Sequence, residues 1–587
     1  MKLSILGLSA LGLALAAPSP AHAAAPAAAW TATDTRAILD VTQTIRLAPD
    51  ISHLTEGERA AVAKLLEVGR IFQDVYEDQN HADARTVRAR LAPGSDEATL
   101  YRLFKGPIAT NLENRQVPFV TVDMPPPGKN VYPPDLTRAE YEAFLAAHPE
   151  LAGALMHPRA VIRRADRASL AYDIVRLRAH PAIDPLHPGL RARLESMASR
   201  PDRSFLYALP YSVNWAEEMT RAHGLLNEAA DAVEGDDWEF ARFLRNRARD
   251  LLSDDYESGD AAWLKGRFGN LNAQIGAYET YDDELAATRG LYSLSLLATR
   301  REETAALRAA MSGIQALEDS LPYDSDRKVT DSVPVGAYDV IADFAQSRGG
   351  NTATNLPNES YLVERYGNIV LLRANIMRNA EIFAGSGDTF GAAIVPEQAG
   401  DLKPDGTFYR TLWHEVGHYI GPDYTASGET LDALGADSGL LEEMKADLVS
   451  LFVAEELHRR GYYDDVGYRA VQASGILRVL QNNRPRREQP YNMMQLMQWN
   501  WFLEHGVLAF EPASGRMRID YARYHDAVAA LLREVIALQE AGDPARAAAF
   551  IEQWGGWRDE LHGRVAANIR AEQHYRYRLF TYGALGE

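Results

Sequence analysis

Two short stretches, 411-TLWHEVGHYI-420 and 441-LEEMKAD-447, decide how this sequence is interpreted. The first contains the pattern H-E-x-x-H. On a helix this spacing puts His414 and His418 one turn apart on the same face, so both imidazoles can reach one metal ion. Neutral imidazole suits zinc, and a catalytic zinc site usually has three protein ligands and one open position for water. The spacing therefore predicts a zinc site.

The second stretch supplies carboxylates one loop later. Glu443 is the best candidate for the third zinc ligand, and Asp447 lies one helical turn beyond it. Glu415 follows the first histidine directly, where a carboxylate can take a proton from a water molecule. Together these residue types predict a zinc hydrolase with Glu415 as its base.

The alternative is a pair of surface histidines on a helix with an ordinary salt-bridging glutamate. The chain has 15 His and 81 Asp plus Glu among 587 residues, so about 0.05 motifs of this kind are expected by chance. Leu412 and Trp413 precede the motif and indicate a buried helix. Both observations favour the metal site.

Composition limits the class of protein. The chain is 46% hydrophobic and 24% charged, which is typical of a globular protein, and its length predicts two or more domains or lobes. A net charge of -20 argues against nucleic acid or an anionic membrane as a partner. The chain has no cysteine, which excludes disulfides and thiol catalysis.

The first residues have the features of a signal peptide. Met1-Lys2 is followed by an uncharged apolar run over 3–16 and by the A-x-A pattern at 21–23. A short membrane anchor is the alternative, but the run is too short to span a bilayer comfortably. We expect cleavage after Ala23 and a periplasmic or secreted mature chain.

Local patterns predict a largely helical chain. The pair Thr55 and Glu58 forms a capping box at the start of a helix. Residues 160–300 are expected to be mostly helical, with a short strand at 205–209. Apolar patches at 335–340 and 368–372 interrupt the helical pattern, and 441–582 is expected to be helical with brief turns.

Four separated segments resemble the dipeptidyl peptidase III family, in the order expected for it. They are 278-YETYD-282, 355-NLPN-358, the zinc helix, and 442-EEMKAD-447. Most of that family carries H-E-x-x-G-H, whereas this chain has the five-residue HEVGH, a form found in some bacterial relatives. The shorter form needs no helix distortion to bring both rings to one face.

The resemblance implies a role for each matching residue. It implies that one zinc ion is bound by His414, His418 and Glu443, with Glu442 and Asp447 hydrogen-bonded to the far nitrogens of the two histidines. It implies that Glu415 is the general base and then the proton donor, and that Tyr281 donates a hydrogen bond to the tetrahedral intermediate. It also implies that the substrate's free amino terminus is bound by Glu279, Asn355 and Asn358.

Two further roles are harder to locate. An arginine that binds the carboxyl side of the substrate corresponds to Arg558. For the second active-site histidine of the family, His505, Tyr491 and Asn492 all remain candidates.

The resemblance also implies an architecture: a mostly α protein with a smaller mixed α/β part, built as two lobes around a wide cleft. The helical lobe carries zinc and the mixed lobe contains a small β-barrel. On this basis we expect a mixed lobe at 24–300, with part of 345–375 returning to it. A helical catalytic lobe at 301–557 and a C-terminal helical segment at 558–587 follow.

The function implied is that of a zinc exopeptidase that releases dipeptides from the free amino terminus of short oligopeptides. We expect a monomer that binds neither nucleic acid nor membrane. The alternatives are a gluzincin-type endopeptidase, a non-catalytic zinc- or peptide-binding protein, and a zinc hydrolase acting on a non-peptide amide. The intact base Glu415 argues against the non-catalytic alternative.

Overall fold

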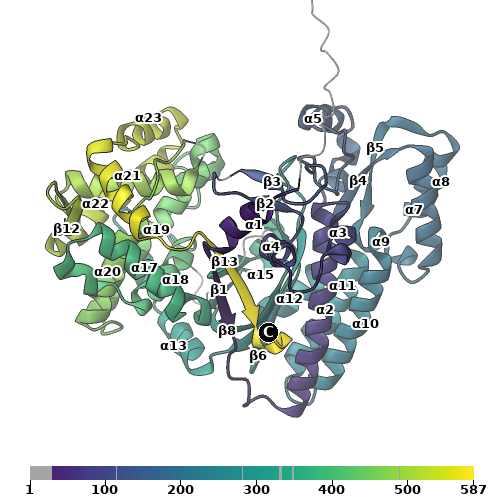
Figure 1. Cartoon of the computed structure of the whole chain (residues 1–587), viewed down its shortest axis with the longest axis horizontal. Helices are drawn as coiled ribbons and strands as arrows, with labels where there is room; N and C mark the ends of the chain where they lie inside the picture. The colour runs from purple at the N-terminus through teal and green to yellow at the C-terminus, as the bar shows by residue number, and fades with distance from the viewer. Residues whose placement is uncertain are drawn as a thin grey trace, which may run out of the picture.

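Two lobes make up the protein, as Figure 1 shows: a helical lobe and a mixed lobe that contains most of the strands. The computed structural model describes residues 29–113, 115–280, 282–329, 334–346, 350–357, 359–487 and 489–587. The expected signal peptide, residues 1–23, lies outside these ranges. None of the helices within them combines the length and the apolar character needed to cross a bilayer.

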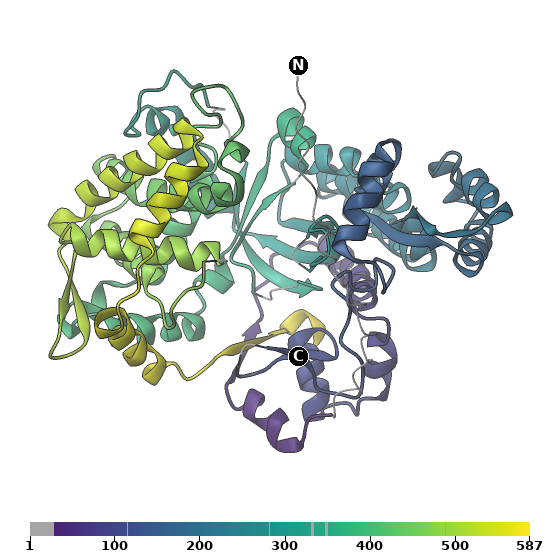
Figure 2. The same ribbon diagram turned by 90° about the horizontal axis from the view of Figure 1, so that it is seen from above.

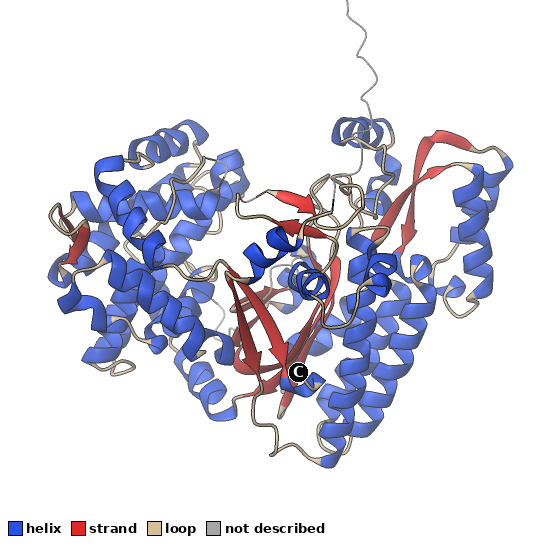
Figure 3. Cartoon of the chain, viewed as in Figure 1, coloured by secondary structure: helices blue, strands red, loops and turns tan. Residues whose placement is uncertain are grey.

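The mixed lobe is built on a five-stranded sheet, which is curled and is drawn in red in Figure 3. Its strands, in spatial order, are β6 (Leu271–Glu279), β7 (Leu291–Thr299), β8 (Val335–Phe344), β10 (Ile369–Arg373) and β9 (Ala353–Leu356). Only the pair β8 and β10 is parallel; the other neighbours are antiparallel. The expected fold class, mostly α with a smaller mixed part in two lobes, is confirmed.

The prediction that 160–300 is mostly helical was wrong for two long strands. In β6 and β7 every residue but the last is buried, so neither strand shows the alternation of buried and exposed positions that marks a half-exposed strand. The same region also contains the hairpin β4 (Ala160–Ala165) and β5 (Asp202–Pro210), of which only the second was anticipated.

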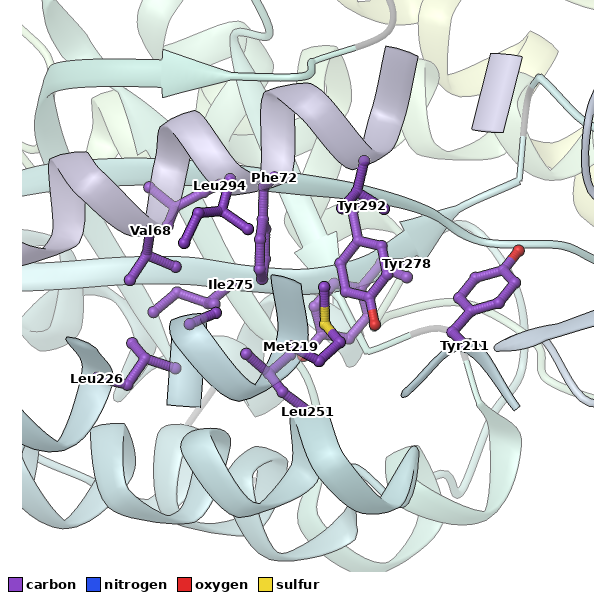
Figure 4. Packing of buried hydrophobic residues seen from close by; sticks show 14 of the residues in the cluster. Val68, Phe72, Tyr211, Met219, Leu226, Leu251, Ile275, Tyr278, Tyr292 and Leu294 are labelled. Carbon is purple, nitrogen blue, oxygen red and sulfur yellow. The ribbon is translucent and has the colours of Figure 1, made fainter. Parts of the chain in front are cut away.

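Helices cover one face of the sheet and form the core of the mixed lobe. They are α2 (Glu56–Asn80), α10 (Ala216–Val233) and α11 (Trp238–Ser253). The expected capping box opens α2, with Thr55 and Glu58 bonding each other's backbone. Figure 4 shows Phe72 of α2 between Leu294 and Tyr292 of β7, with its ring centroid 4.8 Å from that of Tyr292.

At β10 and the start of β8, the opposite face of the sheet belongs to the helical lobe. Along β10, Ile369 and Leu371 lie in the core of the mixed lobe, whereas Val370 and Leu372 lie in the core of the helical lobe. Successive side chains of a strand point to opposite faces, so the sheet is a wall with one core on each side. Figure 2 shows the sheet between the two sets of helices.

The helical lobe surrounds two helices that carry the candidate metal ligands. Its helices are α13 (Arg301–Met311), α17 (Ala380–Ala393), α18 (Pro404–Gly417), α19 (Ser438–Arg459), α20 (Asp465–Val479), α21 (Pro490–Glu504), α22 (Tyr524–Ala541), α23 (Pro544–Trp554) and α24 (Arg564–Glu572). A small hairpin, β11 (Leu508–Glu511) and β12 (Arg516–Ile519), follows α21.

The end of the chain returns to the mixed lobe. After α24, the strand β13 (Tyr577–Tyr582) pairs in parallel with β1 (Thr42–Leu47), near the start of the described chain. The expected C-terminal helical segment, 558–587, is therefore part helix and part strand. The boundaries between lobes drawn at 300 and 557 stay predictions.

Phe72→Ala should lower the free energy of unfolding by about 3–5 kcal/mol, because it leaves a cavity between α2 and the sheet. Phe72 has no exposed surface. Denaturant unfolding followed by circular dichroism measures the effect. Val175→Ala is the control, since Val175 is 65% exposed and its loss should change stability by less than about 0.5 kcal/mol. Equal stability of the two variants would contradict this packing.

Candidate metal centre

His414 and His418 lie at the end of α18, which is anchored in the helical core. Leu412 and Trp413 have no exposed surface, and His414 is only 8% exposed. The two imidazole rings are 5.0 Å apart between centroids and nearly perpendicular, at 86°. The buried helix thus presents both rings on one face, with the spacing that the motif predicts.

Gly417 allows α19 to approach α18 closely. A Cβ atom at this glycine would lie 2.8 Å from both the Cα and the carbonyl oxygen of Ala446, and backbone atoms cannot move aside as a flexible side chain can. Lys445, next to that contact, donates from its ammonium to the carbonyls of Gly417 and Ile420, at 2.8 and 3.0 Å. The contact and this cap together hold α19 against the end of α18.

This approach places Glu443 beside both histidines. Its Oε2 lies 3.3 Å from His414 Nε2 and 4.0 Å from His418 Nε2, and one ligand atom from each residue falls within 4.8 Å of the others. Tetrahedral ligands about 2.0–2.2 Å from zinc are about 3.3–3.6 Å apart. The 3.3 Å separation lies in this range and the 4.0 Å separation slightly exceeds it, so the two imidazole nitrogens and the carboxylate oxygen could hold a zinc ion after a small closing movement.

Carboxylates occupy the far nitrogens of both rings. His414 Nδ1 lies 2.8 Å from Asp447 Oδ1, and His418 Nδ1 is hydrogen-bonded to Glu442 Oε1 at 3.0 Å. A carboxylate at Nδ1 favours a proton there, which leaves the Nε2 lone pair for a metal. In both rings this nitrogen is the one that faces Glu443.

Two arginines keep Asp447 ionised. Arg410 and Arg478 lie 3.3 Å from its two oxygens, and Asp447 itself is only 2% exposed. Burial opposes ionisation, but Arg478, His414 and Arg410 outweigh it and hold the pKa of Asp447 far below its usual range. Burial beside Arg478 also lowers the pKa of Arg410 to about 10.

Glu442 has a comparable set of partners. Lys445 lies 2.9 Å from its Oε1, and Gln539 of α22 donates to its Oε2 at 3.0 Å. Burial again opposes ionisation, but Lys445 and His418 lower the pKa of Glu442 to about 2. Both outer carboxylates are therefore charged at neutral pH, as a carboxylate that orients a ligating histidine must be.

The negative field of the site also acts on His414. Burial lowers the pKa of this imidazole, but Asp447, Glu443 and Glu415 together raise it to about 9 in the absence of a metal ion. Binding of a metal at Nε2 must then displace a proton. Glu415, the predicted base, is half-buried and close enough to His414 to contribute to this field.

Asn355 of the mixed lobe contacts the segment that directly follows α18. This residue lies on β9, the edge strand of the sheet, and its Oδ1 accepts a hydrogen bond of 3.2 Å from the hydroxyl of Tyr419. Tyr419 directly follows the candidate ligand His418. Glu279, at the end of β6, is half-buried. Burial lowers the pKa of Arg373 on β10, and the negative charges of Asp343 and Glu279 offset part of that effect.

The remaining predicted residues are not joined to this group. Tyr281 and Asn358 lie outside the described residues. Arg558 is exposed, and its backbone N–H donates to His562 Nδ1. In the described part of the chain no ion pair or hydrogen bond links Arg558 to the metal ligands, so its role stays a prediction.

Of the candidates for the second active-site histidine, the structure brings Tyr491 to the metal ligands. Its hydroxyl donates to Glu443 Oε1 at 2.9 Å. His505 instead stacks on Trp501, with 4.0 Å between ring centroids, and bonds that residue's carbonyl. Asn492 donates to Gln481. His505 therefore packs at the end of α21, and which residue fills the role of the second active-site histidine stays a prediction.

Sequence reasoning did not identify several residues of the site. Arg410 and Lys445 could have been found, because each lies one helical turn or less from a motif residue. Arg478 and Gln539 come from α20 and α22, and no local spacing connects them with the motif. Tyr491 was a candidate from the sequence, but its contact with Glu443 was not predicted.

The fold and the three ligands define a two-lobed protein with a metal-ligand site in its helical lobe. Two solved structures share this fold. Dipeptidyl peptidase III from Caldithrix abyssi aligns with a TM-score of 0.79 and 22% identity, covering 93% of this chain and 99% of that one. Dipeptidyl-peptidase III from Corallococcus sp. strain EGB aligns with a TM-score of 0.75 and 22% identity, covering 95% and 98%.

Comparison of sequences gives less. No family model matches the chain. The protein named Nudix hydrolase 3 from Arabidopsis thaliana is 28% identical over 438 residues, which are 73% of this chain and 54% of that protein. The chain thus spans about half the length of this curated relative.

Glu443→Ala should lose bound zinc, because two histidines without a carboxylate hold the ion weakly. The measurement is the zinc content of purified protein after dialysis. Glu455→Ala is the matched control, since Glu455 is an exposed residue of the same helix. Full zinc retention in Glu443→Ala would exclude Glu443 as a ligand and make Glu442 the next candidate.

Gly417→Ala should weaken zinc binding by about tenfold or more, because the added methyl forces α18 and α19 apart and displaces Glu443 from the histidines. Competition with a chelator measures the affinity. Gly439→Ala in α19 is the control, since a Cβ atom there meets nothing within 4 Å and should leave zinc affinity unchanged. Wild-type affinity in Gly417→Ala would show that the close contact is not needed.

Proposed function

We propose that this protein is a zinc-dependent dipeptidyl peptidase that releases dipeptides from the free amino terminus of short oligopeptides. The observation that carries the proposal is the group of His414, His418 and Glu443, with Asp447 and Glu442 behind the two rings. Outer carboxylates of this kind orient ligating histidines in zinc enzymes. The shared fold with two dipeptidyl peptidase III structures supports the same reaction.

The proposed chemistry assigns most steps to residues of this chain. A bound zinc ion would polarise the scissile carbonyl and make a water molecule acidic enough to lose a proton near neutral pH. Glu415 accepts that proton and then delivers it to the nitrogen of the leaving amine. By the family resemblance, Tyr281 donates a hydrogen bond to the oxygen that gains negative charge.

Release of dipeptides requires an anchor for the substrate's amino terminus. We assign this role to Glu279, helped by Asn355 and Asn358, because a protonated amine in a cleft needs a carboxylate partner. In the described residues β9 pairs with β10 alone, and we assign its other edge to pairing with an extended peptide. The hydrogen bond between Asn355 and Tyr419 supports this path, because it brings the strand edge to the residue after His418.

The alternative functions differ in whether the substrate's free amino terminus must be bound. A gluzincin-type endopeptidase would use the same ligands but would cut within long chains. A hydrolase of non-peptide amides would need no anchor at all. The Nudix hydrolase match reaches only about half of that relative. A periplasmic or secreted location belongs to this proposal, as do monomeric state and oligopeptide substrates.

A decapeptide with a free amino terminus should be cleaved two residues at a time, whereas its acetylated form should not be cleaved. Acetylation removes the charge that Glu279 binds, and a slip of one residue would move the amine by about 3.3 Å. Mass analysis of the products over time measures both. Efficient internal cleavage of the acetylated peptide would overturn the exopeptidase assignment and favour the endopeptidase.

Glu415→Gln is the variant that separates chemistry from metal binding in this assay. It should keep its zinc, and its turnover rate should fall by a factor of about 10² to 10⁴, because a positioned base contributes a factor of that size. Wild-type turnover by Glu415→Gln would contradict the proposed mechanism, even if the products were dipeptides.

A further inference from the structure

The two oxygens of Glu443 have different surroundings. Oε2 faces the Nε2 atoms of His414 and His418, at 3.3 and 4.0 Å. Oε1 accepts a hydrogen bond of 2.9 Å from the hydroxyl of Tyr491. The predicted metal ligand therefore has one oxygen directed toward the histidines and one occupied by a phenol.

Tyr491 reaches Glu443 from the first turn of α21. Pro490 occupies the first position of this helix and fixes the backbone there, so the side chain that follows is directed by the helix and not by a loose loop. Tyr491 is 41% exposed. Burial of its ring therefore gives little reason for its placement, whereas its hydroxyl reaches Glu443 directly.

Arg478 connects this contact with Asp447, the carboxylate behind His414. Its guanidinium lies 3.3 Å from Asp447 Oδ2 and is close enough to Glu443 and Tyr491 for both to raise its pKa. Arg478 thus lies between the carboxylate behind His414 and the pair formed by Glu443 and Tyr491.

A carboxylate can bind a cation through one oxygen or through both. A hydrogen bond to Oε1 makes that oxygen a weaker donor and restrains rotation of the carboxylate. With one oxygen from Glu443 and two imidazole nitrogens, zinc has three protein ligands and a fourth position for water. With both oxygens bound, that position is crowded.

We propose that Tyr491 is a positioning residue that makes Glu443 a one-oxygen ligand and so keeps one coordination position open. The inference rests on the metal site of the proposed function, but it does not depend on which substrate is cleaved. Tyr491 acts through Glu443 and need not touch the substrate itself.

Tyr491→Phe tests this inference, because it removes the hydroxyl and keeps the ring. The decisive measurement is the visible absorption spectrum of the protein loaded with cobalt(II) in place of zinc. Four-coordinate cobalt(II) absorbs much more strongly than five-coordinate cobalt(II). We expect cobalt-loaded Tyr491→Phe to absorb more weakly than cobalt-loaded wild type, since Oε1 without its hydrogen bond becomes an additional ligand. We also expect the zinc affinity of the variant, measured by chelator competition, to differ from that of wild type by about tenfold.

Tyr172→Phe is the matched control. Tyr172 is 55% exposed on α7 (Arg167–Ala179), in the mixed lobe, and its hydroxyl accepts a hydrogen bond from Arg176. It should match wild type in both measurements, and circular dichroism should show all three proteins equally folded.

An unchanged cobalt spectrum in Tyr491→Phe would overturn the inference even if zinc affinity changed, because the hydrogen bond would then support the fold without setting the coordination. Failure of the wild-type chain to bind zinc or cobalt would overturn both proposals. Wild-type protein that binds metal but releases no dipeptides would contradict the proposed function alone, since the cobalt comparison needs no substrate.

Discussion

The candidate metal centre depends on a backbone contact between two helices. At Gly417 there is no room for a side chain against Ala446, so α18 and α19 touch almost backbone to backbone. Glu443 is part of the helix that this contact brings in, and its distance from the histidines is fixed by how closely the helices approach. The glycine of the HEVGH motif is therefore as much a determinant of the site as the ligands that flank it.

Around this contact the charges of the site fall into two layers. In the outer layer, Asp447 and Glu442 are offset by Arg410, Arg478 and Lys445, so this layer carries no excess of negative charge. The inner carboxylates, Glu443 and Glu415, together match the two positive charges of a divalent ion. An outer layer that is satisfied without the ion can keep both rings oriented before metal arrives.

The sequence was sufficient to group the metal ligands because they obey local rules. His414 and His418 are joined by the helical period, and Glu442, Glu443 and Asp447 lie on one helix just beyond. What brings them together, the glycine contact and the arginine of α20, depends on packing between helices that no spacing encodes. The strands β6 and β7 were missed for a related reason: a strand buried on both faces shows no alternation, and its apolar run resembles that of a buried helix. The contact of Tyr491 with Glu443, which distinguishes it from the other two candidates His505 and Asn492, likewise depends on how α21 packs against α19.

The sheet between the two cores has a consequence for dissecting the protein. Val335, Ala337, Val370 and Leu372 complete the core of the helical lobe, yet they belong to strands of the mixed lobe. A recombinant fragment limited to the helices that carry the metal ligands would leave that surface of its core open to water, at a cost of about 1.5–3 kcal/mol for each large side chain exposed. The two lobes thus share the strands β8 and β10, and an engineer who wished to transplant the candidate metal centre would have to take these strands with it.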